Sequence, residues 1–580
     1  KAIRRQRQMC IRDRYNMKFA IIAAGEGSRL AQEGVEEPKP LVSVCDQPMI
    51  ERLMRIFVDC GASEIVVIIN EQSTSVHRYL KKLDLPVPLK IIVKTTPSSM
   101  HSLHALSPYL RGERFCLTTV DTIFREEEFK KYIRHFERVK DIDGCMAVTP
   151  YVDDEKPLWV GVKEQTGAEG ESLIDQQGYR CKPLITGFHD QCEGDDHLIS
   201  GGIYCLGDKA LDVLDHCMEQ GMSRMRNFQR QLVAEGLRLE AYPIDKILDV
   251  DHKEDIAKAR KFLLPLEGKI LDGIMRDSSF SPNCVNSDAA IFNAVSEQLK
   301  ALGATVYPCR EYSNDEQVSH FTKPEEYSEF MNTVWFVNDV AGYFSMARSN
   351  NALKMLEVVM VDGLPGLNTP VGVMNCVRSE MTSLLMEDGI PMPKSKIVES
   401  FDGLGDWDIY PCWLKRGNAC AQQKEDTCYV ETREEAEKVL QSFDKRNISP
   451  VVLNEHLKGD LVKFYGVEGT DFFYWFYPSK CGHRSKFGLE VINGDAQGIP
   501  FVVEDLKKTA DRAATVLETP IYGGDCIIAE DGSFRIIDFN DWPSFAPCRD
   551  TAAYYIAKRL CMEFEKHPFI KGVTDFEKAE

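Results

Sequence analysis

From Met17 onward, short apolar runs alternate with segments in which apolar residues recur every three or four positions. The first pattern is typical of buried strands and the second of amphipathic helices. Their alternation predicts an α/β fold with a mostly parallel sheet. The expected strands are 18–24, 64–70, 89–94, 114–119 and 199–206, and the expected helices are 49–60, 126–139 and 256–264.

The second half of the chain begins with the same alternation and then changes. A helix at 286–303, a strand at 304–307 and a helix at 350–362 are expected, whereas the later pattern favours antiparallel strands. The stretch 153–197 is rich in Gly, Asp and Gln, which predicts loops inserted over a site. We expect a linker at 265–269 and the domains 17–267, 268–365 and 366–580.

Residues 1–16 are basic and lack periodicity. Basic residues before an apolar run are typical of a secretory signal, but Glu26 and Arg29 end this run too early. We therefore expect 1–16 to be a non-native or disordered extension outside the fold.

Size and composition narrow the possible functions. A chain of 580 residues exceeds the size at which one core keeps growing, so at least two domains are expected. The net charge of −20 argues against nucleic acid or an anionic membrane as the main partner. The 19 cysteines show no zinc spacing, which favours reduced thiols and a cytoplasmic location. No apolar run approaches the ~20 residues of a membrane span.

The most informative motif follows the first expected strand. Gly25 and Gly27 let backbone N–H groups approach phosphates, and Arg29 and Lys39 add positive charge. Leu30 stands where a dinucleotide fingerprint needs a small residue, and no Gly-Lys-Ser/Thr ends a P-loop. The two glycines by themselves would also fit a turn that binds no ligand. The positive charges of Arg29 and Lys39 favour nucleotide binding.

The sequence AAGEGSRL at 23–30, followed by PKPL at 38–41, resembles the signature of the nucleotidyltransferase superfamily. That superfamily includes sugar-1-phosphate, choline-phosphate and molybdopterin-guanine enzymes. The resemblance, extended by later motifs over 17–267, implies a Rossmann-like fold and transfer of a nucleotide from an NTP to a phosphate. It implies catalytic roles for Arg29 and Lys39 and nucleotide contacts from Ala23, Ala24, Gly25, Gly27 and Ser28.

Carboxylates at strand ends are natural ligands for Mg²⁺. Asp121 ends an apolar strand and resembles the metal-binding aspartate of the family; a turn residue is the alternative. For the second ligand, Asp251 is the first choice and Asp249 the second, since alternation places both on one face of a strand. Asp255 and Glu254 suit the first turn of a helix, and His252 is expected to be an exposed loop residue.

The segment 95–103 corresponds to the family's base or ribose contacts. Its serine-rich form, with Ser102 before Leu103, resembles the choline-phosphate branch and so favours CTP. Gly201 and Gly202, together with Lys182, resemble acceptor-site positions.

A second set of oxygen ligands lies near the end of the chain. The segment 522–540 predicts a β-hairpin in which Asp538 and Asn540 share a face. Together with Asp525 they can hold Mg²⁺ between two phosphates; the alternative is an edge hairpin with exposed acids.

This hairpin resembles the metal motif of ATP-grasp enzymes, and its Asp-Phe-Asn-Asp-Trp-Pro sequence is similar to the inositol-polyphosphate kinase branch. The resemblance covers 268–580 and implies antiparallel lid sheets, a lead-in segment at 375–393, and nucleotide contacts from Lys415, Glu455 and Lys463. The lid loop 416–423 has fewer glycines than is typical of the family. Two alternatives are expected for a group of basic residues, which would either bind an anionic acceptor or lie in a solvated loop. The group consists of His483, Arg484 and Lys486.

Together these resemblances predict a fused enzyme with Mg²⁺ in both domains, ATP in the second and another NTP, with CTP favoured, in the first. The second domain would phosphorylate a small molecule, and the first would join that phosphorylated acceptor to a nucleotide. The alternatives are an ATP-grasp carboxylate–amine ligase acting on the first product, or a binding module without turnover.

Overall fold

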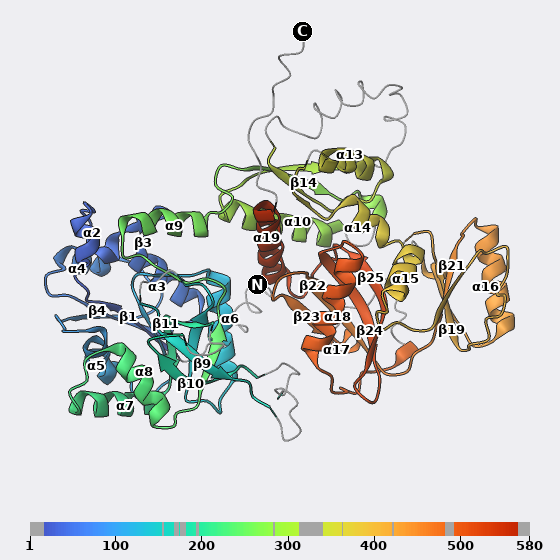
Figure 1. Cartoon of the computed structure of the whole chain (residues 1–580). Coiled ribbons are helices and arrows are strands. Elements are labelled where there is room, and N and C mark those ends of the chain that lie inside the picture. The colour runs from blue at the N-terminus through green and yellow to red at the C-terminus, as the bar shows by residue number, and fades with distance from the viewer. Residues whose placement is uncertain are drawn as a thin grey trace, which may run out of the picture. The chain divides into compact units, whose positions relative to one another are not determined.

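The computed structural model describes residues 17–152, 156–166, 173, 181–192, 197–281, 285–311, 340–361, 363–419, 423–481 and 492–566 (Figure 1). The chain divides into two compact units, with the main boundary after Leu264. The predicted extension at 1–16 lies outside the described residues. In the part that is described, no helix combines the length and the apolarity that a bilayer crossing requires.

The first unit is built on one large sheet. Its order is β5-β4-β1-β6-β11-β8-β12-β10-β9 among the described residues. The strands along it are β5 (Leu89–Val93), β4 (Glu64–Ile69), β1 (Lys18–Ala23), β6 (Phe115–Thr119), β11 (Ile199–Leu206), β8 (Gly144–Thr149), β12 (Leu239–Pro243), β10 (Leu184–His189) and β9 (Trp159–Lys163).

Helices cover both faces of this sheet, each with its own apolar core. One core includes residues of α3 (Met49–Asp59), α4 (Thr74–Lys82) and α6 (Glu126–Arg138). The other includes residues of α5 (Ser99–Leu110), α7 (Asp208–Glu219) and α8 (Met225–Ala234). β1 and β4 are buried almost throughout because they lie between these layers. The predicted α/β class is confirmed.

The sheet is mixed, however, and not mostly parallel as predicted. β1, β4, β5 and β6 pair in parallel, but β11 lies antiparallel between β6 and β8. Parallel neighbours need a long crossover, usually a helix, whereas among the described residues β8 to β11 follow one another without one. The predicted loop insertion at 153–197 also contains β9 and β10, which extend the sheet.

Short elements gather where β1 and β6 end. They are α2 (Ser28–Gln32), the 3-10 turn η1 (Lys39–Leu41), β2 (Ser43–Val44), β3 (Gln47–Pro48), β7 (Thr122–Ile123), β13 (Leu248–Asp249) and α9 (Lys253–Leu263). β13 pairs with β7 in antiparallel fashion, which brings together segments about 125 residues apart in the chain.

The second unit contains three four-stranded sheets among its described residues. The first is parallel, with the order β15-β14-β16-β17, and α10 (Val285–Ala301) packs on it. Its strands are β14 (Ile270–Met275), β15 (Thr305–Arg310), β16 (Gly342–Ser345) and β17 (Gly366–Leu367). The helix α13 (Asn350–Val361) lies between β16 and β17 in the chain, and α14 (Pro370–Asn375) follows β17.

The other two sheets are antiparallel, as predicted for this part of the chain. One contains β18 (Ser395–Val398), β21 (Val451–Glu455), β19 (Cys412–Arg416) and β20 (Thr427–Val430), with α16 (Arg433–Lys445) packed on it. The other contains β23 (Phe473–Phe476), β22 (Asp460–Val467), β24 (Ile521–Ile528) and β25 (Phe534–Asp541). The remaining helices are α15 (Arg378–Glu387), α17 (Pro478–Cys481), α18 (Val503–Val516) and α19 (Arg549–Lys566). The predicted hairpin at 522–540 is confirmed as β24 and β25.

Candidate functional site

The glycine loop of the first unit lies between β1 and α2. Gly27 has φ of +61°, a conformation that glycine adopts without strain, and a Cβ placed there would lie 2.8 Å from the Cβ of Lys39. At Gly25 a Cβ would meet nothing within 4 Å, so the backbone is open on that side. Glycine at 27 therefore lets the loop pack against the backbone that carries Lys39.

Lys39 joins two carboxylates that come from distant parts of the chain. Its Nζ lies 2.5 Å from Oδ2 of Asp121 and 2.5 Å from Oδ1 of Asp251. Arg29 adds a second cation, with its guanidinium 3.1 Å from Oδ2 of Asp251. The structure thus brings together four residues that the sequence singled out separately.

The environment of Lys39 keeps its amine charged. Burial alone would lower the pKa of Lys39, but the charges of Asp121 and Asp251, and the hydrogen bonds that they accept, raise it above its ordinary value.

Backbone pairing explains why the two aspartates meet. Asp249 on β13 faces Thr122 on β7, and the next residue, Val250, donates its backbone N–H to the carbonyl of Asp121 at 3.1 Å. Asp251 follows directly and accepts from Lys39. Asp249 has an exposed side chain, and β13 ends at this residue, so the predicted run of alternating positions does not continue as strand to Asp251.

One oxygen of this cluster fits a metal ion. Oδ1 of Asp121 is buried and has no hydrogen-bond partner, although the other oxygen pairs with Lys39. Buried carboxylate oxygens are costly to leave unpaired. With Asp251 beside it, Asp121 offers the one or two carboxylates by which Mg²⁺ is usually held. The donor set therefore suits a hard divalent cation.

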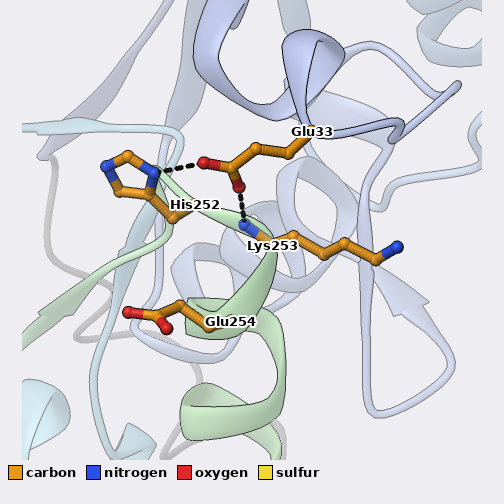
Figure 2. A pocket seen from close by; sticks show the side chains of 4 residues that line it. All are labelled: Glu33, His252, Lys253 and Glu254. Carbon is orange, nitrogen blue, oxygen red and sulfur yellow. Dashed lines mark hydrogen bonds and ion pairs between the residues drawn. The ribbon is translucent and has the colours of Figure 1, made fainter.

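A hollow of about 650 Å³ opens beside Asp251, where α2 ends and α9 begins. It is lined by Glu33, His252, Lys253 and Glu254 (Figure 2). Glu33 accepts from Nδ1 of His252 at 2.6 Å and from the backbone N–H of Lys253 at 2.7 Å, whereas the side chain of Glu254 points away from it. The hydrogen bond to Glu33 raises the pKa of His252 and lowers that of Glu33.

His252 is therefore more than the exposed loop residue that the sequence predicted. It is the N-cap of α9, where Asp255 accepts from the backbone N–H of His252 at 2.8 Å in a capping box. Asp255 and Glu254 lie in the first turn, as predicted. Glu33 was missed; its only signal in the sequence is a position four residues after Arg29, and it caps the end of α2.

The other predicted residues of the first unit have contacts of their own. Ser102 is buried on α5, and its hydroxyl lies 2.6 Å from that of Thr96. A Cβ on Gly201 would collide with Ile247 at 2.3 Å, so Gly201 packs against the segment that leads to Asp249. Lys182 lies 5.2 Å from the ring centroid of Tyr242. Ala23 and Ala24 are buried at the end of β1, and Ser28 is exposed at the start of α2.

A buried group of possible metal ligands lies elsewhere in this unit. His135, Cys145 and Glu240 approach one another on α6, β8 and β12. Nε2 of His135 is 2.7 Å from Glu240, which also accepts from Gln165 at 3.0 Å. The Glu240 carboxylate is thus already satisfied by protein donors.

In the second unit, charged residues face one another between the two antiparallel sheets. Lys463 on β22 lies opposite Asp525 on β24, with 2.8 Å between Nζ and Oδ1, and Asp525 lies opposite Asp538 on β25. Arg378 at the start of α15 approaches Asp538 at 3.2 Å. Lys415, on β19 of the facing sheet, donates to the carbonyl of Ile537 at 3.1 Å.

These contacts set the charges of the cluster. Burial, with Arg378 nearby, lowers the pKa of Lys415 to about 8. Burial would raise the pKa of Asp538, but Arg378, Lys415 and Lys463 hold it below its ordinary value. Burial would lower the pKa of Lys463, but the charge of Asp525 and the hydrogen bond that it accepts raise it above its ordinary value.

The remaining predicted residues of this unit lie around the same sheets. Asn540 pairs with Gly523 across the hairpin, one residue from Asp541. Glu455 ends β21 and accepts from the backbone N–H of Lys394 at 2.9 Å. Part of the predicted lid loop, 420–422, lies outside the described residues, as do His483, Arg484 and Lys486.

The comparison with known families bears on the first unit. The model of the MobA-like NTP transferase domain matches residues 19–227. This part of the chain is therefore similar to MobA-like NTP transferase domains. The matched region includes the glycine loop, Lys39 and Asp121, and ends before Asp251.

Three curated proteins are similar to part of this chain. The chain is 23% identical over 251 residues to the bifunctional IPC transferase and DIPP synthase of Thermococcus kodakarensis, covering 43% of this chain and 50% of the relative. It is 26% identical over 234 residues to mannose-1-phosphate guanylyltransferase 1 of Arabidopsis thaliana, covering 39% and 59%. The match to glucose-1-phosphate cytidylyltransferase of Salmonella typhi is 22% over 214 residues, covering 34% and 79%. The chain thus spans only about half to three-fifths of the first two relatives.

Among solved structures, the inositol-1-phosphate CTP transferase from T. maritima aligns over 42% of this chain and 96% of its own, with 13% identity and a TM-score of 0.34. The UDP-glucose pyrophosphorylase from Acinetobacter baumannii aligns over 43% and 94%, with 18% identity and a TM-score of 0.35.

Proposed function

We propose that the first unit transfers a nucleotide from an NTP to a phosphorylated small molecule, a sugar-1-phosphate or an inositol phosphate, with release of pyrophosphate. The observation that carries the proposal is the convergence of the glycine loop, Lys39, Asp121 and Asp251 at one edge of the sheet. The family match over 19–227 and the sugar-phosphate nucleotidyltransferases among its relatives support it.

The proposed reaction is a direct in-line substitution. An acceptor phosphate oxygen attacks the α-phosphorus, the new P–O bond forms, the bond to the bridging oxygen breaks, and pyrophosphate leaves with that oxygen. The loop N–H groups near Gly25 and Gly27 would bind the phosphates, and Arg29 and Lys39 would stabilise the charge that spreads over them. A Mg²⁺ held by Asp121 and Asp251, with Asp249 as the alternative ligand, would neutralise phosphate charge.

The test is a pyrophosphate-release assay with each of the four NTPs against glucose-1-phosphate, mannose-1-phosphate and inositol-1-phosphate. We expect one NTP to give a nucleotide-linked product, with CTP favoured by the serine-rich segment 95–103, which runs into α5. Asp121→Asn should remove the activity. The matched control is Asp212→Asn, because Asp212 is an exposed aspartate on α7 that pairs with Arg111. Full activity in Asp121→Asn would contradict the assignment.

For the second unit we propose an ATP-grasp kinase that phosphorylates the small-molecule acceptor. Supporting it are the facing antiparallel sheets and the cluster of Lys415, Lys463, Asp525 and Asp538 between them. Asp525, Asp538 and Asn540 would hold Mg²⁺, with Glu455 at the nucleotide base. A carboxylate–amine ligase and a binding module without turnover are the alternatives.

The assay that separates these alternatives uses ATP with a panel of sugars, inositols and carboxylic acids. A new phosphate ester indicates a kinase, and an acyl phosphate trapped by hydroxylamine indicates a ligase. Lys415→Ala should lose ADP release, whereas Lys508→Ala, an exposed lysine on α18, should not. Unchanged ADP release in Lys415→Ala would contradict the assignment of the site.

A further inference from the structure

We propose that Lys39 is an internal counter-ion that competes with the divalent metal for Asp121 and Asp251. The lysine would thereby weaken metal binding when no nucleotide is present. A bound triphosphate would relieve this competition, because the ammonium would move from the aspartates to the phosphates. The inference rests on the proposed function of the first unit. It adds that the triphosphate promotes tight binding of the metal.

The position of Lys39 supports such a role. Its ammonium contacts both carboxylates at the same distance, 2.5 Å, and its side chain is only 11% exposed. A buried ammonium needs an anionic partner, since its desolvation is otherwise uncompensated. In this structure the two aspartates supply that anion.

A metal held by both aspartates would compete with the ammonium for two of their oxygens. A Mg²⁺ ion lies about 2.1 Å from each ligand oxygen. Lys39 already contacts Oδ2 of Asp121 and Oδ1 of Asp251, so a metal shared by these oxygens must displace it. The buried Oδ1 of Asp121 remains as a first point of attachment.

The glycine loop provides the alternative anion site. Lys39 packs so closely on Gly27 that a Cβ there would lie 2.8 Å from its own Cβ. Phosphates bound by the loop would therefore lie within reach of a lysine side chain that needs only to rotate. Arg29 is a contrast, because it contacts Asp251 alone and is 57% exposed, so it should compete weakly.

The test is titration of the full chain with Mn²⁺ alone, followed by electron paramagnetic resonance, with no nucleotide present. Lys39→Met should bind Mn²⁺ more tightly than wild type, by on the order of tenfold, which lies within the usual range of coupling between sites. Lys39→Arg keeps the charge and should stay near wild type. Lys209→Met, which removes an exposed pair with Asp143, is the matched control and should not change the affinity.

Two outcomes would overturn the inference: a Lys39→Met affinity within twofold of wild type, or equal tightening in Lys39→Arg. Asp121→Asn separates this failure from that of the proposed function. If Asp121→Asn still binds Mn²⁺ as wild type does, the metal site itself is wrongly assigned and both proposals fail.

A variant-free measurement covers the case in which Lys39→Met does not fold. Mn²⁺ should raise the rate at which acetic anhydride modifies Lys39 in the wild-type chain, measured by mass spectrometry, because displacement frees the amine. The rate at Lys209 should not change. An unchanged rate at Lys39 under saturating Mn²⁺ would contradict displacement.

Discussion

The two charge clusters of this protein are assembled in different ways. In the first unit, one lysine bridges two aspartates that come from separate loops at the edge of a sheet. In the second unit, each aspartate has its own cation: Asp525 pairs with Lys463 and Asp538 with Arg378. Strand register fixes the second arrangement, because Lys463, Asp525 and Asp538 lie opposite one another on three neighbouring strands.

The two clusters use the same residue types, lysine and aspartate, in different backbone settings, and we expect them to differ in stiffness. A register-fixed cluster is held by the backbone ladder on both sides of each residue. An edge cluster depends on loops and on the charges themselves, so removal of one charge should disturb its partners more. Each unit can therefore be tested by the same change at corresponding positions.

The largest expected effect is a clean separation of two activities. Asp121→Asn should reduce pyrophosphate release by on the order of 10³-fold, because transition-state charge loses its main support, and leave ATP turnover intact. Asp538→Asn should do the reverse. Both rates are measured on each purified variant. Loss of both activities in either variant would contradict two independent sites.

A smaller effect should appear in the pH dependence of ATP binding. Burial lowers the pKa of Lys415 to about 8, so its charge is present below that pH and lost as the pH rises through it. ATP affinity of the second unit should therefore weaken above pH 8. Fluorescence titration with a labelled ATP analogue from pH 6.5 to 9.5 measures this. Lys415→Arg, which stays charged, should show a flat profile.

A buried carboxylate outside both clusters gives a reference whose pKa is shifted by burial. Asp272 on β14 is 1% exposed, its Oδ2 has no hydrogen-bond partner, and burial raises its pKa to about 7. The folded state therefore binds a proton that the unfolded chain releases above its lower pKa near 3.8, and stability falls as the pH rises from about 4 to 7. Asp272→Asn should raise the melting temperature at pH 8, with a difference that shrinks at pH 5. Calorimetry measures this, and an equal difference at both values would contradict the cause.

The smallest effect concerns the exposed pair of Glu33 and His252. The hydrogen bond raises the pKa of His252, so the charge pair stabilises below the ordinary histidine pKa and is lost as the pH rises through the raised value. Glu33→Gln should lower the melting temperature slightly at pH 6 and hardly at all at pH 8.5. A larger loss at the higher pH would show that packing, and not charge, links α2 with α9.

The sequence alone was enough to single out candidate residues at the ends of strands and in the turns between them. Lys39, Asp121 and Asp251 stood out because the pattern and the resemblance to nucleotidyltransferase motifs agreed on them, and the structure brings them together although Lys39 and Asp251 lie 212 residues apart. The hairpin predicted at 522–540 was equally visible, since alternation and a turn are local signals.

Contacts between distant elements were not predictable in the same way. Glu33 binds the start of α9, and Arg378 meets Asp538 160 residues later. Such pairs depend on how helices are oriented, which apolar spacing does not encode. The antiparallel return of β11 was missed for a related reason, because strand direction depends on a connection whose pattern carries little periodicity.

The backbone hydrogen bond from Val250 to Asp121 limits where the first unit can be cut into fragments. A fragment cut where the family match ends, at residue 227, would retain the glycine loop, Lys39 and Asp121 but lose Asp251 and α9. Its lysine would keep one anion of two. On a ribosome, likewise, the loop would emerge more than 200 residues before the aspartate that completes its charge balance, so Lys39 would lack its second anion until Asp251 has been synthesised.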